Sequence, residues 1–116
     1  MMRPSADLPA VYLCREAIDF RKGINGLAVL VEAVLTLDPF SAQLFVFCNR
    51  RRDRIKILYW ERNGFCLWQK RLERDKFPWP RSEGAARAIT VEQLRMLLAG
   101  IDFWNAHEAI SYRSVV

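Results

Sequence analysis

The sequence contains no hydrophobic run long enough to cross a membrane. Charged residues interrupt every apolar stretch of its 116 residues before it reaches the ~18 residues that a spanning helix needs. The first residues, Met1 to Asp7, also lack the apolar core of a signal peptide. These two absences predict a cytoplasmic protein without a membrane anchor.

Cysteine and histidine are too few for a disulfide framework or a zinc site. The three cysteines, Cys14, Cys48 and Cys66, contain no C-x-x-C pair, and the only histidine, His107, lies far from them in the sequence. This pattern favours reduced cysteines that pack as small hydrophobic side chains. His107 has no nearby Ser or Cys partner, so we expect it at the surface. We therefore expect neither a metal ion nor a cofactor.

The acidic residues are poorly placed for catalysis. A metal-dependent nuclease needs several carboxylates that converge on its metal ions. Four aspartates are available, but turn or helix-cap chemistry already accounts for each position. They are Asp19, Asp38, Asp53 and Asp102. The sequence therefore predicts a protein that is not an enzyme.

Basic residues are abundant, and they are concentrated in one stretch. The chain has 18 Lys and Arg against 13 Asp and Glu, and fourteen of the basic residues are arginines. Residues 50–76 contain ten basic and four acidic residues, a net charge of +6, while the remainder carries eight and nine, a net charge of −1. Arginine binds phosphate groups through two parallel hydrogen bonds, so this excess favours a nucleic-acid partner.

The composition and the hydrophobic pattern predict one α+β domain over residues 1–116. With 52% hydrophobic residues, a chain of this length can build a core without metals or disulfides. We expect an antiparallel β-meander of three to five strands with two helices packed on one of its faces. The expected main strands are Gln43–Cys48, Arg54–Trp60 and Phe65–Leu72, and a shorter one is Val11–Cys14.

Turn residues separate these strands. The basic stretch from Asn49 to Asp53 links the first two main strands. Residues 61–64 link the last two main strands, and Asn63-Gly64, in which both residues tolerate positive φ, is the hairpin signal within them. The Ser-, Gly- and Ala-rich stretch from Arg81 to Arg87 is expected to be a loop.

Two further stretches have helical periodicity. Residues 21–37 repeat apolar side chains every three or four positions, and Asp19 is the expected N-cap. Gly23 and Gly26 in the first turns indicate either a close approach of the backbone there or a later start of the helix. A second helix begins after Thr90, which forms a capping-box pattern with Gln93.

The candidate binding site is the hairpin loop that precedes the second main strand. Three consecutive arginines repel one another, and an anionic partner relieves that repulsion. Basic residues at the end of the third main strand are expected near the same end of the meander. The candidate contacts from these two segments are Arg50, Arg51, Arg52, Arg54, Lys56, Lys70, Arg71 and Arg74. A solvated basic face explains the same cluster, but its arginine content favours a nucleic-acid or acidic-protein partner.

Aromatic residues lie between these charges. Tyr59, Trp60 and Trp68 fit either a stacking platform for bases or a hydrophobic core, and their residue types favour the core.

Arg21 and Lys22 form a weaker basic candidate at the start of the first helix. Helix N-termini attract anions, and cations there are unfavourable unless an anion bridges them. A bound phosphate explains the pair, and a salt bridge to Asp19 or Glu16 explains it equally well.

Several strings of the sequence, taken in order, resemble one family. Asp19–Leu27 reads D-F-R-K-G-I-N-G-L, and Asp38–Ser41 reads D-P-F-S. Leu44–Phe47 and Asn49–Lys56 follow as L-F-V-F and N-R-R-R-D-R-I-K. Later matching strings are Lys70–Glu73, Trp79-Pro80 and Leu97–Asp102. Together they resemble the TnpB accessory proteins of insertion sequence 66 family transposons.

The resemblance implies a bacterial mobile-element protein that is encoded beside a separate, larger transposase, which carries the cutting chemistry. Two functions are then open. The protein binds DNA, at the transposon ends or the target, through the arginine-rich hairpin, as the clustering of arginines favours. Alternatively, it is a protein–protein adaptor that docks an acidic surface of the transposase without binding DNA, as the lack of a groove-reading helix favours.

Overall fold

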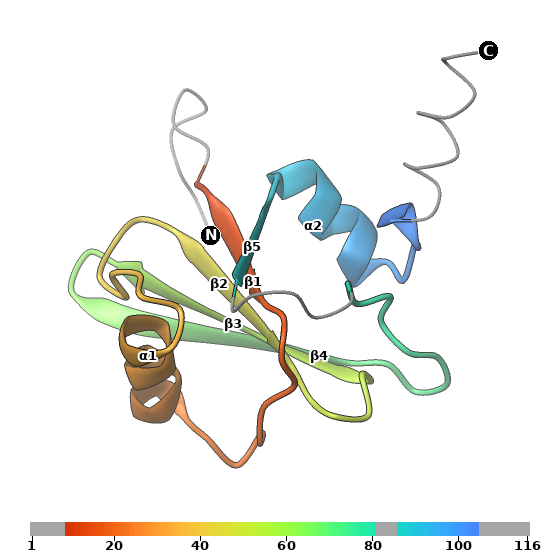
Figure 1. Cartoon of the computed structure of the whole chain (residues 1–116), viewed down its shortest axis with the longest axis horizontal. Coiled ribbons are helices and arrows are strands. Elements are labelled where there is room, and N and C mark those ends of the chain that lie inside the picture. Colours follow the sequence, from red (N-terminus) through yellow and green to blue (C-terminus); the bar gives the residue numbers. More distant parts are fainter. Residues whose placement is uncertain (1–8, 81–85, 105–116) are drawn as a thin grey trace.

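Five strands form one mixed β-sheet in the computed structural model, which describes residues 9–80 and 86–104 (Figure 1). Their order across the sheet is β4-β3-β2-β1-β5, with β4 and β5 at the two edges in the described part of the chain. The strands are β1 Val11–Cys14, β2 Leu44–Cys48, β3 Arg54–Glu61, β4 Gly64–Arg71 and β5 Ala86–Ile89. The helices are α1 Ile24–Ala33 and α2 Val91–Leu98. The predicted α+β class is confirmed.

Three of the strands form the predicted antiparallel meander, in which β2 pairs with β3 and β3 pairs with β4. The short strand β1 lies parallel to β2 on the other side. Neighbouring parallel strands need a long crossover connection, and α1 lies within it. The N-terminal half of the fold is therefore a β-α-β unit to which the meander is attached.

Strand β5 corrects one prediction. It pairs antiparallel with β1 at all four of its positions, so Ala86 and Arg87 belong to the sheet and not to a loop. Its sequence A-R-A-I contains one β-branched residue, so local propensity does not mark it as a strand, and pairing with β1 imposes the extended conformation. Residues 81–85 of the expected loop lie outside the described residues.

The two helices pack on opposite faces of the sheet, and the prediction that both cover one face is wrong (Figure 1). Side chains of β2 alternate between the faces. Phe45 and Phe47 pack with α1, whereas Leu44 and Val46 belong to the core that includes α2. All five residues of β2 are buried. An uninterrupted apolar strand is typical of a strand covered on both sides, because a one-sided layer shows alternating apolar and polar residues.

Helix α1 is shorter than predicted at both ends. Its N-cap residue is Gly23, which makes no side-chain capping bond, and Asp19 binds Arg21 instead of capping the helix. The helix ends at Ala33, and the chain leaves the right-handed helical region by Thr36, which has a φ of +54°.

Helix α2 has the predicted capping box. The backbone N–H of Gln93 donates to the Thr90 hydroxyl at 3.0 Å, and the Thr90 N–H donates to the Gln93 side-chain oxygen at 2.9 Å. After the helix, Gly100 has a φ of +80°. The N–H groups of this glycine and of the next residue bond carbonyls of the last helical turn. This C-terminal motif requires a left-handed residue, which accounts for the glycine.

The β3–β4 hairpin turns within the predicted connector, residues 61–64. Glu61 and Gly64 are paired, so Arg62 and Asn63 form the turn. Arg62 has the positive φ, +54°, that the first position of such a tight turn requires. The Asn63-Gly64 pair therefore indicates the hairpin correctly but not the two residues that form its turn.

Two of the three cysteines are buried as predicted, and Cys66 is only partly buried. Cys14, Cys48 and Cys66 are free thiols, and the first two are buried. Burial raises the pKa of Cys48 to about 12, and it also raises the pKa of Cys14.

Within residues 9–80 and 86–104, none of the helices combines the length and the hydrophobicity that a membrane crossing needs. His107 lies outside the described residues.

Candidate nucleic-acid interface

The loop between β2 and β3, Asn49–Asp53, is a tightly bonded turn that we name the arginine turn. The Asn49 side-chain oxygen accepts the N–H groups of Asp53 and Arg54 at 3.1 and 3.0 Å. The Asn49 amide nitrogen donates to the Asp53 carboxylate at 2.6 Å. That bond lowers the pKa of Asp53, and the charges of Arg54 and Arg51 add to the effect. Asn49 therefore organises the backbone of the turn.

Backbone hydrogen bonds fasten the arginine turn to the chain that follows β4. The Arg52 carbonyl accepts the Phe77 N–H at 2.6 Å, and the Asp53 carbonyl accepts the Leu72 N–H at 2.8 Å. Phe77 is itself buried in the core that includes α2. The side chains of the turn therefore project from a backbone that is held in place on two sides.

The arginine side chains of the turn differ in exposure. Arg50 and Arg51 are exposed, and neither guanidinium makes an ion pair or hydrogen bond with another described residue. Arg52 is half-buried, and its Nη1 is buried without a hydrogen-bond partner in the described part of the chain. Arg54, the first residue of β3, is also half-buried. The first two arginines are thus the accessible charges of the turn.

A segment that is distant in the sequence, residues 17–20, runs beside the arginine turn. Ile18 forms a parallel bridge with Asn49, and its N–H donates to the Cys48 carbonyl at 3.0 Å. Between the two segments lies an open hollow of about 370 Å³. Its lining residues are Ala17, Ile18, Asp19, Phe20, Asn49, Arg50 and Arg51. The fold therefore joins two of the sequence strings that carry the family resemblance into one surface.

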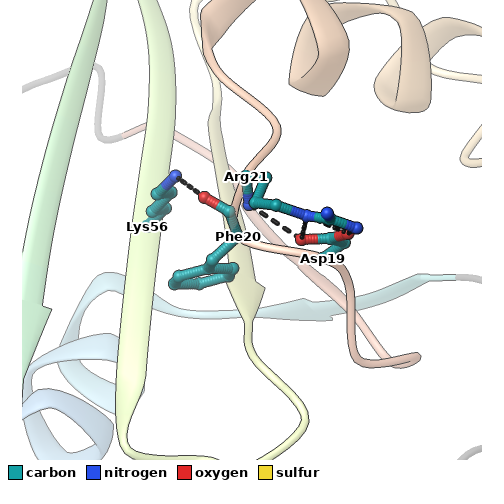
Figure 2. A network of polar contacts seen from close by, with 4 residues as sticks. All are labelled: Asp19, Phe20, Arg21 and Lys56. Atoms are coloured by element: carbon teal, nitrogen blue, oxygen red, sulfur yellow. Dashed lines mark hydrogen bonds and ion pairs between the residues drawn. The ribbon is translucent and has the colours of Figure 1, made fainter.

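Lys56 ties β3 to this segment from inside the protein (Figure 2). Only 7% of its surface is exposed. Its ammonium donates to the carbonyl oxygens of Phe20 at 2.8 Å and Lys22 at 3.0 Å, and it lies 4.8 Å from the centre of the Phe20 ring. Burial lowers the pKa of Lys56, with a contribution from Arg54. A phosphate contact by Lys56 would have to compete with these internal bonds.

Arg21 is paired within the same segment (Figure 2). Its Nε and Nη2 donate to the Asp19 carboxylate, the shortest of these bonds being 2.6 Å. Its backbone N–H adds a bond of 2.9 Å. Side-chain and backbone bonds from Arg21 lower the pKa of Asp19 to about 2. The predicted salt bridge is confirmed, while phosphate binding by Arg21 and the exposed Lys22 stays a prediction.

The basic residues at the end of β4 divide between the two faces of the sheet. Arg71 is opposite Arg54, on the face that α1 covers, and forms an ion pair with Glu73 at 3.0 Å. Lys70 lies on the other face, where its Nζ donates to the last carbonyl of α2 at 2.7 Å. Arg74 is exposed beyond the strand. The structure thus places Arg71 beside Arg54 and separates Lys70 from both.

The aromatic candidates lie away from the arginine turn. Trp60 and Phe65, next to the β3–β4 turn, pack with Phe40, and the three ring centroids are 5.0–5.2 Å apart. Tyr59 packs against the core on the opposite face, as the core interpretation predicts. Trp68 lies on that face too and is 41% exposed.

Phe20 is a further residue of the site, and its residue type alone did not indicate this role. Its carbonyl and its ring both contact Lys56, and they hold the residue 17–22 segment near the arginine turn. The alternation of side chains along β3 could have indicated this contact, because it places Lys56 on the same face of the strand as the apolar Leu58, which is buried. A lysine on such a face needs internal acceptors.

Comparison with known proteins identifies the family that the sequence strings resemble. The family of IS66 Orf2-like proteins matches residues 9–108. The uncharacterized protein y4hO of Sinorhizobium fredii (strain NBRC 101917 / NGR234) is 40% identical over 107 residues, which cover 92% of this chain and 93% of that protein. The uncharacterized protein y4jC of the same organism is 37% identical over 103 residues, which cover 89% and 87%. No solved structure matches. This chain therefore belongs to the IS66 Orf2-like family of transposon-associated accessory proteins.

Proposed function

We propose that this protein binds duplex DNA, at the transposon ends or the target, as a non-catalytic accessory factor in transposition. The arginine turn is the contact surface, with Arg50 and Arg51 at its centre. The observation that carries the proposal is the exposure of both guanidinium groups, neither of which is ion-paired with a described residue. Unpaired guanidinium groups can donate to phosphate oxygens without first breaking an ion pair, and a backbone that is already fixed avoids the cost of ordering the loop on binding.

The charges around the turn support an anionic ligand. Asp53 belongs to the turn and Asp19 lines the hollow beside it, and both carboxylates are engaged by other side chains, Asp19 by Arg21 and Asp53 by Asn49. Neither carboxylate therefore forms an ion pair with Arg50 or Arg51. Because Lys56 and Lys70 have internal acceptors, this proposal assigns them no phosphate. The supporting contacts are expected from Arg52, Arg54, Arg71, Arg74, Arg21 and Lys22.

A salt titration of DNA binding tests the proposal. Each phosphate that a protein neutralises contributes about 0.9 to the slope of log affinity against log salt concentration. Replacing Arg50 and Arg51 together with glutamine should therefore flatten the slope by roughly two units, and adding Arg52→Gln should bring the change to two or three units at about 0.9 each. The measurement is fluorescence anisotropy of a labelled duplex at several NaCl concentrations.

A matched control removes the same charge elsewhere. Arg62→Gln with Arg95→Gln changes one arginine in the β3–β4 turn and one on α2. This double variant should retain most of the wild-type slope, because phosphate contacts and not net charge set the slope. If the Arg50 and Arg51 variant is folded and its slope equals that of wild type, the arginine turn is not a phosphate site.

A second candidate function is that of an adaptor whose arginine turn docks an acidic surface of the transposase. The composition of the helices favours it. Within α1 there is no Lys or Arg, and α2 carries only Arg95, so neither presents the basic and amide row of a groove-reading helix. Under this alternative the wild-type protein does not bind duplex DNA, and the Arg50 and Arg51 variant loses affinity for the transposase.

A further inference from the structure

The outer surface of α1 and of the loop after it is apolar and acidic, although the chain as a whole carries a net charge of +5. Val29 is 63% exposed and Phe40 is 56% exposed. Residues 24–40 contain two charged side chains, Glu32 and Asp38, and no Lys or Arg. An amphipathic surface helix normally presents polar residues on its outer side. A cluster of exposed apolar residues there marks an interaction site.

A groove of about 160 Å³ lies in this surface, between α1 and the loop. It is lined by Ala28, Val29, Glu32, Ala33, Pro39 and Phe40. Glu32 is the only charged residue of the lining, and it makes no ion pair with another described residue. The ring of Phe40, which forms one wall, is supported from behind by Trp60 and Phe65.

We propose that this groove, the α1 groove, is the docking site for a partner protein. The partner inserts an apolar side chain of an amphipathic segment, and a lysine or arginine beside that side chain pairs with Glu32. Charge complementarity selects this occupant. A nucleic-acid backbone is repelled by Glu32 and Asp38. In a symmetric dimer formed through the same patch, each Glu32 carboxylate would face a surface of the other copy that contains no Lys or Arg.

The α1 groove and the arginine turn lie at opposite ends of the meander. Phe40 contacts the two aromatic residues next to the β3–β4 turn, whereas the arginine turn immediately precedes β3. The eight residues of β3 span roughly 24 Å at about 3.4 Å per residue. A partner can therefore occupy the groove while the arginine turn holds another ligand, and this inference does not depend on DNA binding.

Binding of the purified transposase of the same element to the full chain tests the proposal. Val29→Glu should weaken binding at least about tenfold, because it places a charge in an apolar contact. Glu32→Lys should do the same, because it opposes the cation of the partner. Ile101→Glu is the matched control, because it places the same charge at a 50% exposed apolar residue beside α2. This variant should bind the transposase with the affinity of wild type. The Arg50 and Arg51 double variant should also retain transposase binding.

Three results would overturn the proposal. The first is a wild-type protein that does not bind the transposase. The second is that the folded Val29→Glu and Ile101→Glu variants bind the transposase with equal affinity. The third is sedimentation that shows a wild-type dimer and a Val29→Glu monomer, since the occupant is then a second copy. Circular dichroism checks folding, and if Val29→Glu is unfolded the Glu32→Lys variant decides alone.

Discussion

The ammonium of Lys56 lies 2.8 Å from the carbonyl oxygen of Phe20, across thirty-six positions of sequence. The contact joins the middle of β3 to the segment that leads into α1. It therefore fixes the Asp19–Arg21 ion pair relative to the arginine turn, although no local pattern connects the two. Within the two strings that carry the family resemblance, Lys56 thus supports the surface from inside, while Arg50 and Arg51 are exposed to solvent.

Replacing Lys56 with methionine should lower the free energy of unfolding by about 2–3 kcal/mol, because two carbonyl oxygens lose a charged donor. Methionine retains an apolar side chain in the buried space, so the loss reports mainly the hydrogen bonds. Urea denaturation measures it. Lys22→Met, at an exposed position, is the control and should stay within about 0.5 kcal/mol of wild type. A Lys56→Met variant whose stability lies within about 0.5 kcal/mol of wild type would show that the Lys56 bonds contribute no net stability.

The carboxyl group of Asp19 should titrate with a pKa of about 2, measured by NMR, against its usual 3.8. In Arg21→Gln the pKa should return toward 3.8, because the hydrogen bonds from the guanidinium are the largest cause of the shift. A pKa lowered in the folded state means that the pair stabilises the fold above about pH 4 and that this contribution is lost as the pH falls toward 2. An unchanged pKa in the variant would contradict the ion pair.

Thiol labelling should distinguish the three cysteines. In the native protein at pH 8, Cys66 should react rapidly with a thiol reagent, because it is partly accessible. Cys14 and Cys48 should react slowly, since both are buried and burial raises the pKa of each thiol. All three should react in denaturant. If Cys14 and Cys48 react rapidly in the native Cys66→Ser variant, both thiols are accessible to solvent and the prediction is wrong.

Lys70→Met should reduce stability without changing the salt dependence of DNA binding. The ammonium donates to the last carbonyl of α2, a favourable position for a cation, so its loss should cost about 1–2 kcal/mol in urea denaturation. The slope measured by anisotropy should equal that of wild type. Lys76→Met, at an exposed position, should change neither quantity. A slope that falls by about one unit in Lys70→Met would instead identify Lys70 as a phosphate contact.

Local patterns predicted the elements whose stabilising contacts lie close together in the chain. The alternation along β3 and β4 and the turn residues between them indicated the hairpin, since hairpin partners are neighbours in sequence. The capping box of Thr90 and Gln93 spans three positions and was predicted for the same reason. The basic character of the arginine turn is likewise a property of five consecutive residues.

The sequence by itself therefore determined the α+β class, the meander, the family and the concentration of arginines. Tertiary structure alone decided that β1 lies parallel to β2, that A-R-A-I is a strand, and that the helices cover opposite faces. It also decided which basic side chains remain free, since Lys56 and Lys70 find carbonyl acceptors on segments 28 to 36 positions away. Those outcomes depend on which distant segments pack together. Only that packing determines whether a charged side chain or a backbone group loses water and which internal partner replaces it.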